Sequence, residues 1–364
     1  MQSGTSRCFG GLGYVKKWQK RTLTVVGVFV LVVGLFTLEF MSFGGQFRDL
    51  SARSPGACST LPLNASAEDI QIDRNRSIAY LSSLDRRGLV EGLAVDGTVL
   101  QVDLVADPLR AEPALSSAPP GFRPHGMSLY RMGDGKQRLF VISHPEGDEH
   151  VIEVFEQNAD NRFTHVGSLR DPLLVSPNAI VAVGPQQFYV ANDKGDAGFL
   201  GRVGESLFRT GLSTVVYFDS ESMRVEVERL KSAVGMGLSP DGLTAYVAET
   251  LGKRVSVYTR NPLTGDLIFK QHIELDGSPD NINVDANGAL WIAVHAKLID
   301  LIRHFGDASH HAPTTLLRYT AGTTTPVYVN DGSEISAGSV GAAFGGRLYM
   351  GSITEPQLLI CRIR

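Results

Sequence analysis

Two adjacent metal-capable side chains, Asp280 and Asn281, stand near the start of a strand–turn–strand phrase in the last third of the sequence. Carboxylate and amide oxygens are the ligands that calcium takes in proteins. The phrase runs from Ser278 to His295, with an alternating strand, a turn at 286–288 and a return strand over 289–294. The pattern predicts a loop that presents oxygen ligands at the start of a β-hairpin.

The same phrase recurs along the chain. Clear copies occupy residues 178–192 and 235–249, and weaker copies occupy 68–82, 125–144 and 338–352. The six copies start roughly 45 to 58 residues apart, which is at or just above the period of propeller blades. We therefore predict an all-β fold, a six-bladed β-propeller with four strands in each blade.

The residues that open the six copies, called the channel heads below, should converge around one axis, because the first strand of each blade faces a shared central channel. The predicted channel heads are Glu68, Asp69, His125, Asn178, Val234, Gly235, Asp280, Asn281, Gly338 and Ser339. Carboxylates, amides and a histidine on one axis indicate a site for a hard cation such as calcium. A histidine beside such an ion is a candidate base for activating water.

Each of these residues also has a structural interpretation when it is taken alone. An acid pair such as Glu68 and Asp69 is often a solvated turn, and Asp280 alone would be an Asx-turn. His125 precedes a glycine and could be an exposed turn residue, while His144 ends an apolar strand and could be a core histidine. His295 also ends an apolar strand, and we interpret it as structural.

Composition bounds the class of protein. The chain has 364 residues, a formal net charge of −4 and 43% hydrophobic residues, which indicates a globular protein without the basic footprint of a nucleic-acid-binding protein. Its 39 glycines and 17 prolines supply many turns, and long helical periodicity is absent from the repeat region. A Gly-x-Ser-x-Gly elbow is absent as well, so a serine nucleophile is not expected.

The N-terminus differs from the rest of the chain. Its first 21 residues carry five basic side chains and no acid, and an apolar run follows from Leu23. By length and flanking charge this run predicts an uncleaved signal-anchor of a single-pass type II membrane protein. The alternative is a secreted protein, with signal cleavage among the small residues at 54–58. We predict four parts: a cytosolic tail over 1–22, a transmembrane helix over 23–43, a stalk over 44–57 and the propeller over 58–364.

The cysteines agree with export. Cys8 precedes the apolar run, whereas Cys58 and Cys361 bracket the propeller. In an oxidising compartment the natural pairing joins Cys58 to Cys361 and closes the ring, and two unrelated buried thiols are the alternative. Asn64 and Asn75 lie in N-glycosylation sequons that are usable only if this side is lumenal or extracellular.

Several phrases in order resemble one family. They lie at residues 123–128, 139–145, 173–184, 239–242, 278–282 and 290–295. Together with the cysteine pair, they make the stretch from Cys58 to Cys361 similar to the serum paraoxonase/arylesterase family. The resemblance implies a six-bladed propeller with two calcium ions in its channel that hydrolyses lactones and aryl esters.

The resemblance also implies roles for individual residues. Transferred position by position, the calcium that takes part in catalysis would be held by Glu68, Asn178, Asp280 and Asn281. The catalytic histidine pair would be His125 and His144. The second, structural calcium would use the carboxylate of Asp69 and the backbone oxygen of Met127, and Trp291 would line the substrate pocket.

Two positions depart from the family pattern. Val234 stands where the family has an asparagine ligand, and Ala179 stands where it has an aspartate of the structural site. We therefore expect one catalytic calcium ion, with Asp69 the only side-chain ligand left at the second site. The alternative function is a catalytically impaired, membrane-tethered propeller that acts as a binding module. A small ester or lactone and the membrane are the expected partners.

Overall fold

The computed structural model describes residues 12–147, 149–195 and 198–363, with side chains from Trp18 onward. The chain divides into two compact units, Met1–Phe47 and Arg48–Arg364. In the first unit, helix α1 (Leu12–Phe43) contains Trp18–Phe43, which is long and apolar enough to be a candidate membrane span. The predicted N-terminal helix is therefore confirmed, and it begins earlier than the predicted Leu23.

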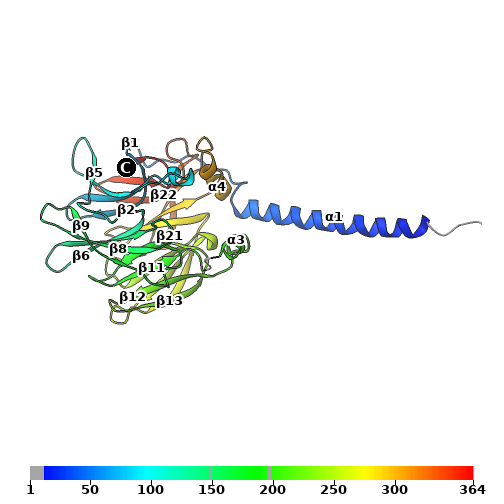
Figure 1. Cartoon of the computed structure of the whole chain (residues 1–364). Helices are drawn as coiled ribbons and strands as arrows, with labels where there is room; N and C mark the ends of the chain where they lie inside the picture. The colour runs from blue at the N-terminus through cyan, green and yellow to red at the C-terminus, as the bar shows by residue number, and fades with distance from the viewer. Residues whose placement is uncertain (1–11, 148, 196–197, 364) are drawn as a thin grey trace, which may run out of the picture. The chain divides into compact units, whose positions relative to one another are not determined.

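In the second unit, strands β1 to β24 form six antiparallel four-stranded sheets (Figure 1). Blade 1 contains β2 (Ser66–Asp73), β3 (Ile78–Leu84), β4 (Thr98–Asp103) and β5 (Ala111–Pro113). Blade 2 contains β6 (Pro124–Arg131), β7 (Gln137–Ser143), β8 (Val151–Gln157) and β9 (Phe163–Leu169). Blade 3 contains β10 (Pro177–Ala182), β11 (Phe188–Asn192), β12 (Ser213–Phe218) and β13 (Met223–Leu230).

The remaining blades follow the same order. Blade 4 contains β14 (Ala233–Leu238), β15 (Thr244–Glu249), β16 (Arg254–Arg260) and β17 (Leu267–Glu274). Blade 5 contains β18 (Ser278–Val284), β19 (Leu290–His295), β20 (Thr314–Thr320) and β21 (Thr323–Asn330). Blade 6 contains β22 (Gly338–Phe344), β23 (Arg347–Ser352), β24 (Gln357–Arg362) and β1 (Cys58–Pro62). The predicted six-bladed β-propeller is confirmed.

The ring is closed by residues from the two ends of the propeller. β1 pairs with β24, and Cys58 lies opposite Cys361 in this register. The two cysteines form a disulfide, as predicted. The innermost strands β2, β6, β10, β14, β18 and β22 pack against one another in sequence, and β22 packs against β2.

The hydrophobic core is divided among the blade interfaces. Because successive side chains of a strand point to opposite faces, a blade buries one set against each neighbour. Between blades 4 and 5, for example, Val234, Val255, Ile282 and Ile292 form one cluster. Comparable clusters fill the other five interfaces.

Three short helices follow the second strand of alternate blades: α2 (Arg86–Val90), α3 (Phe199–Phe208) and α4 (Leu298–Gly306). A 3₁₀ turn spans Thr250–Gly252. Since the second strand of a blade is antiparallel to the first, it ends where the first begins. The three helices therefore lie at the end of the propeller that carries the channel heads.

The opposite end of the channel is lined by polar groups. A cavity of about 200 Å³ is lined by inner strands of blades 1 to 5, including Gln71, Ser128 and Asn283. Arg74, just after β2, donates hydrogen bonds to the backbone oxygens of Val284 and Ala343. These contacts tie blades 1, 5 and 6 together at that end.

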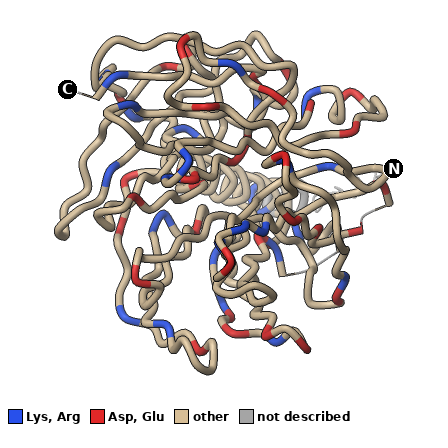
Figure 2. Tube along the Cα trace, turned by 90° about the vertical axis from the view of Figure 1, so that its left-hand side faces the viewer, with Lys and Arg blue, Asp and Glu red and all other residues tan. Residues whose placement is uncertain are grey.

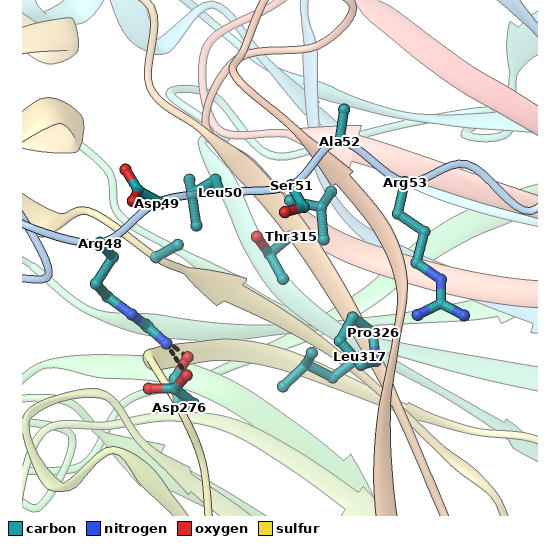
Figure 3. Close-up of a pocket in the computed structure, with 12 residues that line it drawn as sticks. Arg48, Asp49, Leu50, Ser51, Ala52, Arg53, Asp276, Thr315, Leu317 and Pro326 are labelled. Atoms are coloured by element: carbon teal, nitrogen blue, oxygen red, sulfur yellow. Dashed lines mark hydrogen bonds and ion pairs between the residues drawn. The ribbon is translucent and has the colours of Figure 1, made fainter.

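The segment before the first blade is bound to the propeller. Arg48 donates to the backbone oxygen of Asp276 over 2.7 Å and forms an ion pair with its carboxylate (Figure 3). Arg53 exchanges two backbone hydrogen bonds with Val329, each 2.8 Å long. The predicted stalk over 44–57 therefore differs from the structure, in which residues 48–57 form a strap along the propeller. The pocket beside the strap contains none of the predicted site residues.

Charged residues are intermixed over the propeller. In Figure 2, Lys and Arg are interspersed with Asp and Glu along the drawn trace, without an extended region of one sign. This distribution agrees with the small net charge.

Candidate metal and catalytic centre

A β-bulge interrupts the first hairpin of every blade at its channel head. In each hairpin, the inner strand has one more residue than the second strand between the two residue pairs that flank the bulge. The shifts lie between Ala67 and Ile70, Pro124 and Met127, Pro177 and Ala179, Ala233 and Gly235, Pro279 and Ile282, and Gly338 and Val340. A bulge leaves its extra residue outside the ladder and re-aims its side chain. The channel heads are thus structurally equivalent positions.

Glu68 is the meeting point of four blades. Asn281 Nδ2 donates to Glu68 Oε1 over 2.8 Å and to its backbone oxygen over 3.2 Å. Ser339 Oγ donates to the same backbone oxygen over 2.8 Å. His125 Nε2 lies 3.7 Å from Glu68 Oε1, and Arg86 Nη2 lies 3.9 Å from Glu68 Oε2. The structure therefore brings together residues separated by more than 270 positions.

Asp280 is paired with a histidine that sequence reasoning had treated as structural. His295 Nε2 lies 2.8 Å from Asp280 Oδ2, and both residues are buried. Their positions explain the contact, because Ser278 pairs with His295 across the hairpin and Asp280 lies in the bulge that follows. Burial raises the pKa of Asp280, although the contact with His295 opposes this rise.

Asn178 is held by close backbone contact between blades. A Cβ atom on Gly126 would lie 2.3 Å from the backbone oxygen of Asn178, and one on Gly235 would lie 2.4 Å from that of Asp280. Both positions therefore need glycine for neighbouring inner strands to approach so closely. The side-chain oxygen of Asn178 is buried and has no hydrogen-bond partner.

Asp69 has a different environment from Glu68. Its Oδ1 accepts from the backbone nitrogen of Ile70 over 2.7 Å, and its Oδ2 accepts from that of Met127 over 2.8 Å. Burial and the neighbouring charge of Glu68 raise the pKa of Asp69 to about 7. Both carboxylate oxygens of Asp69 are thus engaged by the backbone, and Ala179 supplies no second carboxylate.

Three histidines form a hydrogen-bonded row. His125 Nδ1 lies 3.0 Å from His144 Nε2, and His144 Nδ1 lies 2.8 Å from His150 Nδ1. Burial lowers the pKa of His125 to about 3, and the positive charge of Arg86 contributes to that effect. Burial and His125 lower the pKa of His144 as well. His150 was not predicted from the sequence. Ser143 pairs with Val151 across the hairpin, and this register places His150 opposite His144.

The donor set fits a hard cation. Glu68, Asp69 and Asp280 are all buried, and burial raises the pKa of each of them. Glu68 Oε2 and Asn178 Oδ1 are buried oxygens without a hydrogen-bond partner. Buried charge and unpaired oxygens are costly unless a cation binds them. Among the residues that the structure describes, no group of three or more His, Cys, Asp or Glu side chains is arranged to hold a metal ion. The candidate donors are two carboxylates, Glu68 and Asp280, and two amides, Asn178 and Asn281. A search restricted to His, Cys, Asp and Glu leaves out the two amides.

Val234 and Trp291 lie apart from these donors. Val234 is 8% exposed and packs in the cluster between blades 4 and 5, so it supplies no oxygen. Trp291 packs between blades 5 and 6, and its Nε1 donates to Asp285 Oδ2 over 3.1 Å. Its role in lining the substrate pocket stays a prediction. Asn64 and Asn75 are both exposed.

The sequence profile of the arylesterase family matches residues 59–363. The chain belongs to the arylesterase family. Human serum paraoxonase/arylesterase 2 is 30% identical over 313 residues, which cover 83% of this chain and 87% of that protein. Rat serum paraoxonase/arylesterase 1 is 28% identical over 353 residues, which cover 92% of this chain and 97% of that protein. The resemblance inferred from the sequence phrases is confirmed at the level of the family.

Solved structures of more distant sequence share the fold of this arylesterase-family chain. A luciferin-regenerating enzyme has a TM-score of 0.52 at 12% identity, covering 84% of this chain and 95% of that chain. The β-propeller domain of Cps50 (Swd1) from Myceliophteria thermophila has a TM-score of 0.52 at 10% identity, covering 85% and 100%. At these identities the likeness concerns the fold alone.

Proposed function

We propose that this arylesterase-family propeller is a calcium-dependent hydrolase of lactones and aryl esters. The observation that carries the proposal is the contact of Glu68 with Asn281 and His125, which joins oxygen donors and a candidate base at one point. Glu68, Asn178, Asp280 and Asn281 would hold one calcium ion. When bound, calcium would polarise the ester carbonyl group. The curated relatives carry the names paraoxonase and arylesterase, which supports the substrate class.

His125 is the proposed base. If His144 Nδ1 donates to His150, then His144 Nε2 accepts from His125 Nδ1, and the lone pair of His125 Nε2 is left on the side of Glu68. At neutral pH the lowered pKa keeps His125 uncharged, which leaves Nε2 open to a proton from water but makes the isolated imidazole a weak base. The carboxylate of Glu68, 3.7 Å from Nε2, would stabilise the imidazolium that forms.

Substitutions at Asp280 and His125 test the two parts of this proposal in the full chain in detergent. We expect Asp280→Ala to abolish calcium binding, measured by calorimetry, and hydrolysis of phenyl esters and lactones, because it removes a charge from the donor set. His125→Gln should keep calcium binding and lower turnover by about 100- to 10,000-fold. Asp266→Ala and His272→Gln, on the outer part of blade 4, are the matched controls. Unchanged calcium affinity in Asp280→Ala would contradict the site.

A binding module without catalysis is the second candidate function. The burial of Val234 in the core and the engagement of Asp69 by backbone amides favour it, because both leave fewer calcium ligands. The metal content of purified protein separates the two functions. One calcium ion per chain in protein purified in millimolar calcium supports the enzyme, and a stable protein that binds no calcium and has no hydrolytic activity supports the module.

We further propose that α1 anchors the chain as a single-pass type II membrane protein with the propeller lumenal or extracellular. The basic residues that precede the apolar run from Leu23 and the disulfide both support this orientation. Glycosidase treatment should change the electrophoretic mobility if Asn64 or Asn75 is modified. Digestion of the propeller by protease added to sealed microsomes would contradict the orientation.

A further inference from the structure

Arg86 lies at the candidate metal centre, although it was not among the residues predicted to form the site. It is the first residue of α2, and its Nη2 donates to the backbone oxygen of Pro124 over 3.0 Å. The same nitrogen lies 3.9 Å from Glu68 Oε2, and the two side chains are 14% and 4% exposed. Arg86 Nη1 and Glu68 Oε2 are both buried without a hydrogen-bond partner. Arg86 and Glu68 are therefore close enough for electrostatic attraction, but they form no hydrogen bond with each other.

Arg86 is the basic residue nearest to three buried acidic side chains of the candidate site. Glu68, Asp69 and Asp280 each act electrostatically on its guanidinium. Among the residues that the structure describes, Arg86 is the only Lys or Arg within 4.0 Å of any of these three carboxylates. Arg86 and a bound calcium ion would therefore compete for the same acidic side chains.

Arg87, the next residue, points elsewhere. Its guanidinium contacts the backbone oxygen and the ring of His304 on α4. Two adjacent arginines of one short helix therefore have different functions in the fold. Arg87 joins α2 to α4, whereas Arg86 reaches the channel heads.

We propose that Arg86 is a tethered counter-cation that shares Glu68 with calcium, stabilising the metal-free centre and weakening its affinity for the ion. The proposal rests on the calcium site proposed above. Two cations beside one carboxylate repel each other, and the repulsion is strong where water is largely excluded. With Val234 supplying no ligand, the wild-type site should bind calcium with a dissociation constant of about 10⁻⁴ to 10⁻³ M, as in extracellular calcium modules. Occupancy would then follow the free calcium concentration outside the cell.

Calcium titration of wild type, Arg86→Gln and Arg87→Gln tests the proposal, with the full chain in detergent after chelator treatment. Both substitutions remove one positive charge from the same helix. We expect Arg86→Gln to bind calcium about tenfold more tightly than wild type, and Arg87→Gln to bind within about twofold. The rise in Tm on adding calcium should also be larger for Arg86→Gln than for wild type or Arg87→Gln. Arg86→Lys, which keeps the charge, should stay close to wild type.

The outcomes separate this proposal from the proposed function. If Asp280→Ala abolishes calcium binding but Arg86→Gln binds no more tightly than wild type, the role of Arg86 is wrong and the site stands. If wild type binds no calcium, both proposals are wrong. An Arg86→Gln variant that folds only with calcium supports the exchange of one cation for another. A variant that stays unfolded with or without calcium overturns it, because Arg86 would then be needed by the fold itself.

Discussion

Val234 shows how a single side chain distinguishes one channel head from another. Its backbone has the same bulge as the heads that carry Asn178 and Asp280. Its side chain, however, packs with Ala248 and Ile282 in the core between blades. The backbone at this head is therefore suited to present a ligand, and the residue type alone prevents it.

Replacing Val234 by asparagine should restore an oxygen donor at this head. We expect Val234→Asn to raise calcium affinity and strengthen any esterase activity, because an added amide oxygen completes the donor set. The same change should destabilise the metal-free protein by about 1–3 kcal/mol, since an amide would be buried in an apolar cluster. Calorimetric titration and urea unfolding in chelator measure the two effects. Val234→Ala, which loses packing and gains no ligand, is the control, and equal calcium affinity in both variants would contradict the prediction.

The sequence predicted the site residues at the channel heads better than it predicted the site residues outside them. Asn281 and His125 were found because the repeat aligns them. His295 was interpreted as structural, because a histidine that ends an apolar strand looks like a core residue until the bulge beside it is known. Arg86 was missed, since an Arg-Arg pair after a strand resembles a solvated turn and no repeat marks its position.

At the level of elements, the bulged hairpins depend on close contact between blades. Gly126 lies against the backbone of Asn178 in the next blade. We expect Gly126→Ala to lower calcium affinity at least about tenfold and to reduce stability by roughly 1–3 kcal/mol, because the added methyl group forces the two inner strands apart. Gly133→Ala is the control, since a Cβ atom there would meet nothing within 4 Å. Calorimetry and urea unfolding measure both effects, and identical behaviour of the two variants would show that the approach is not required.

The contact between α2 and α4 should be sensitive to acid. Burial lowers the pKa of His304 from its ordinary value of 6.5, although its hydrogen bond to the backbone oxygen of His310 opposes the shift. The groups that face it include Arg87, His310 and His311, which are positive when protonated, and the hydroxyl groups of Thr354 and Ser336. Because the unfolded chain binds this proton more readily than the folded chain, stability should fall as pH falls through about 6.5.

Thermal unfolding at pH 7.5 and 5.5 measures this effect in the full chain. We expect His304→Gln to lose less stability than wild type over this interval, since glutamine keeps a hydrogen-bonding group but takes up no proton. His165→Gln is the control, because His165 lies on β9 in blade 2, away from α2 and α4. An equal loss of Tm in wild type and His304→Gln would exclude His304 as the source.

Strands were easier to predict than the elements between them. Alternating apolar residues and turn signals marked the first hairpin of each blade. The helices α2, α3 and α4 span only 5, 10 and 9 residues, too few to show long helical periodicity. The stalk predicted over 44–57 could not reveal its attachment to the propeller. That attachment depends on partners more than 220 positions away, Asp276 in the loop before blade 5 and Val329 on β21.

At the level of the whole molecule, one disulfide closes the ring. We expect Cys58→Ser to lower the free energy of unfolding by about 2–5 kcal/mol, because it removes a covalent link between distant parts of the chain. Cys8→Ser, which lies outside the described residues, should leave the stability of the propeller unchanged. Urea unfolding of the unreduced full chain measures the difference. Recovery of both Cys58 and Cys361 as free thiols by alkylation of unreduced protein would contradict the link.

The pairing of β1 with β24 also affects how the chain folds while it is being synthesised. The two cysteines are 303 positions apart, which corresponds to roughly 15–60 s of synthesis at about 5–20 residues per second. During this interval β1 has no strand to pair with, and under the proposed topology Cys58 would wait as a free thiol in an oxidising compartment. The chain has three cysteines, and under the proposed topology Cys8 stays on the other side of the membrane. Cys58 therefore meets no competing cysteine of its own chain, and a wrong internal disulfide cannot form while the last blade is being completed.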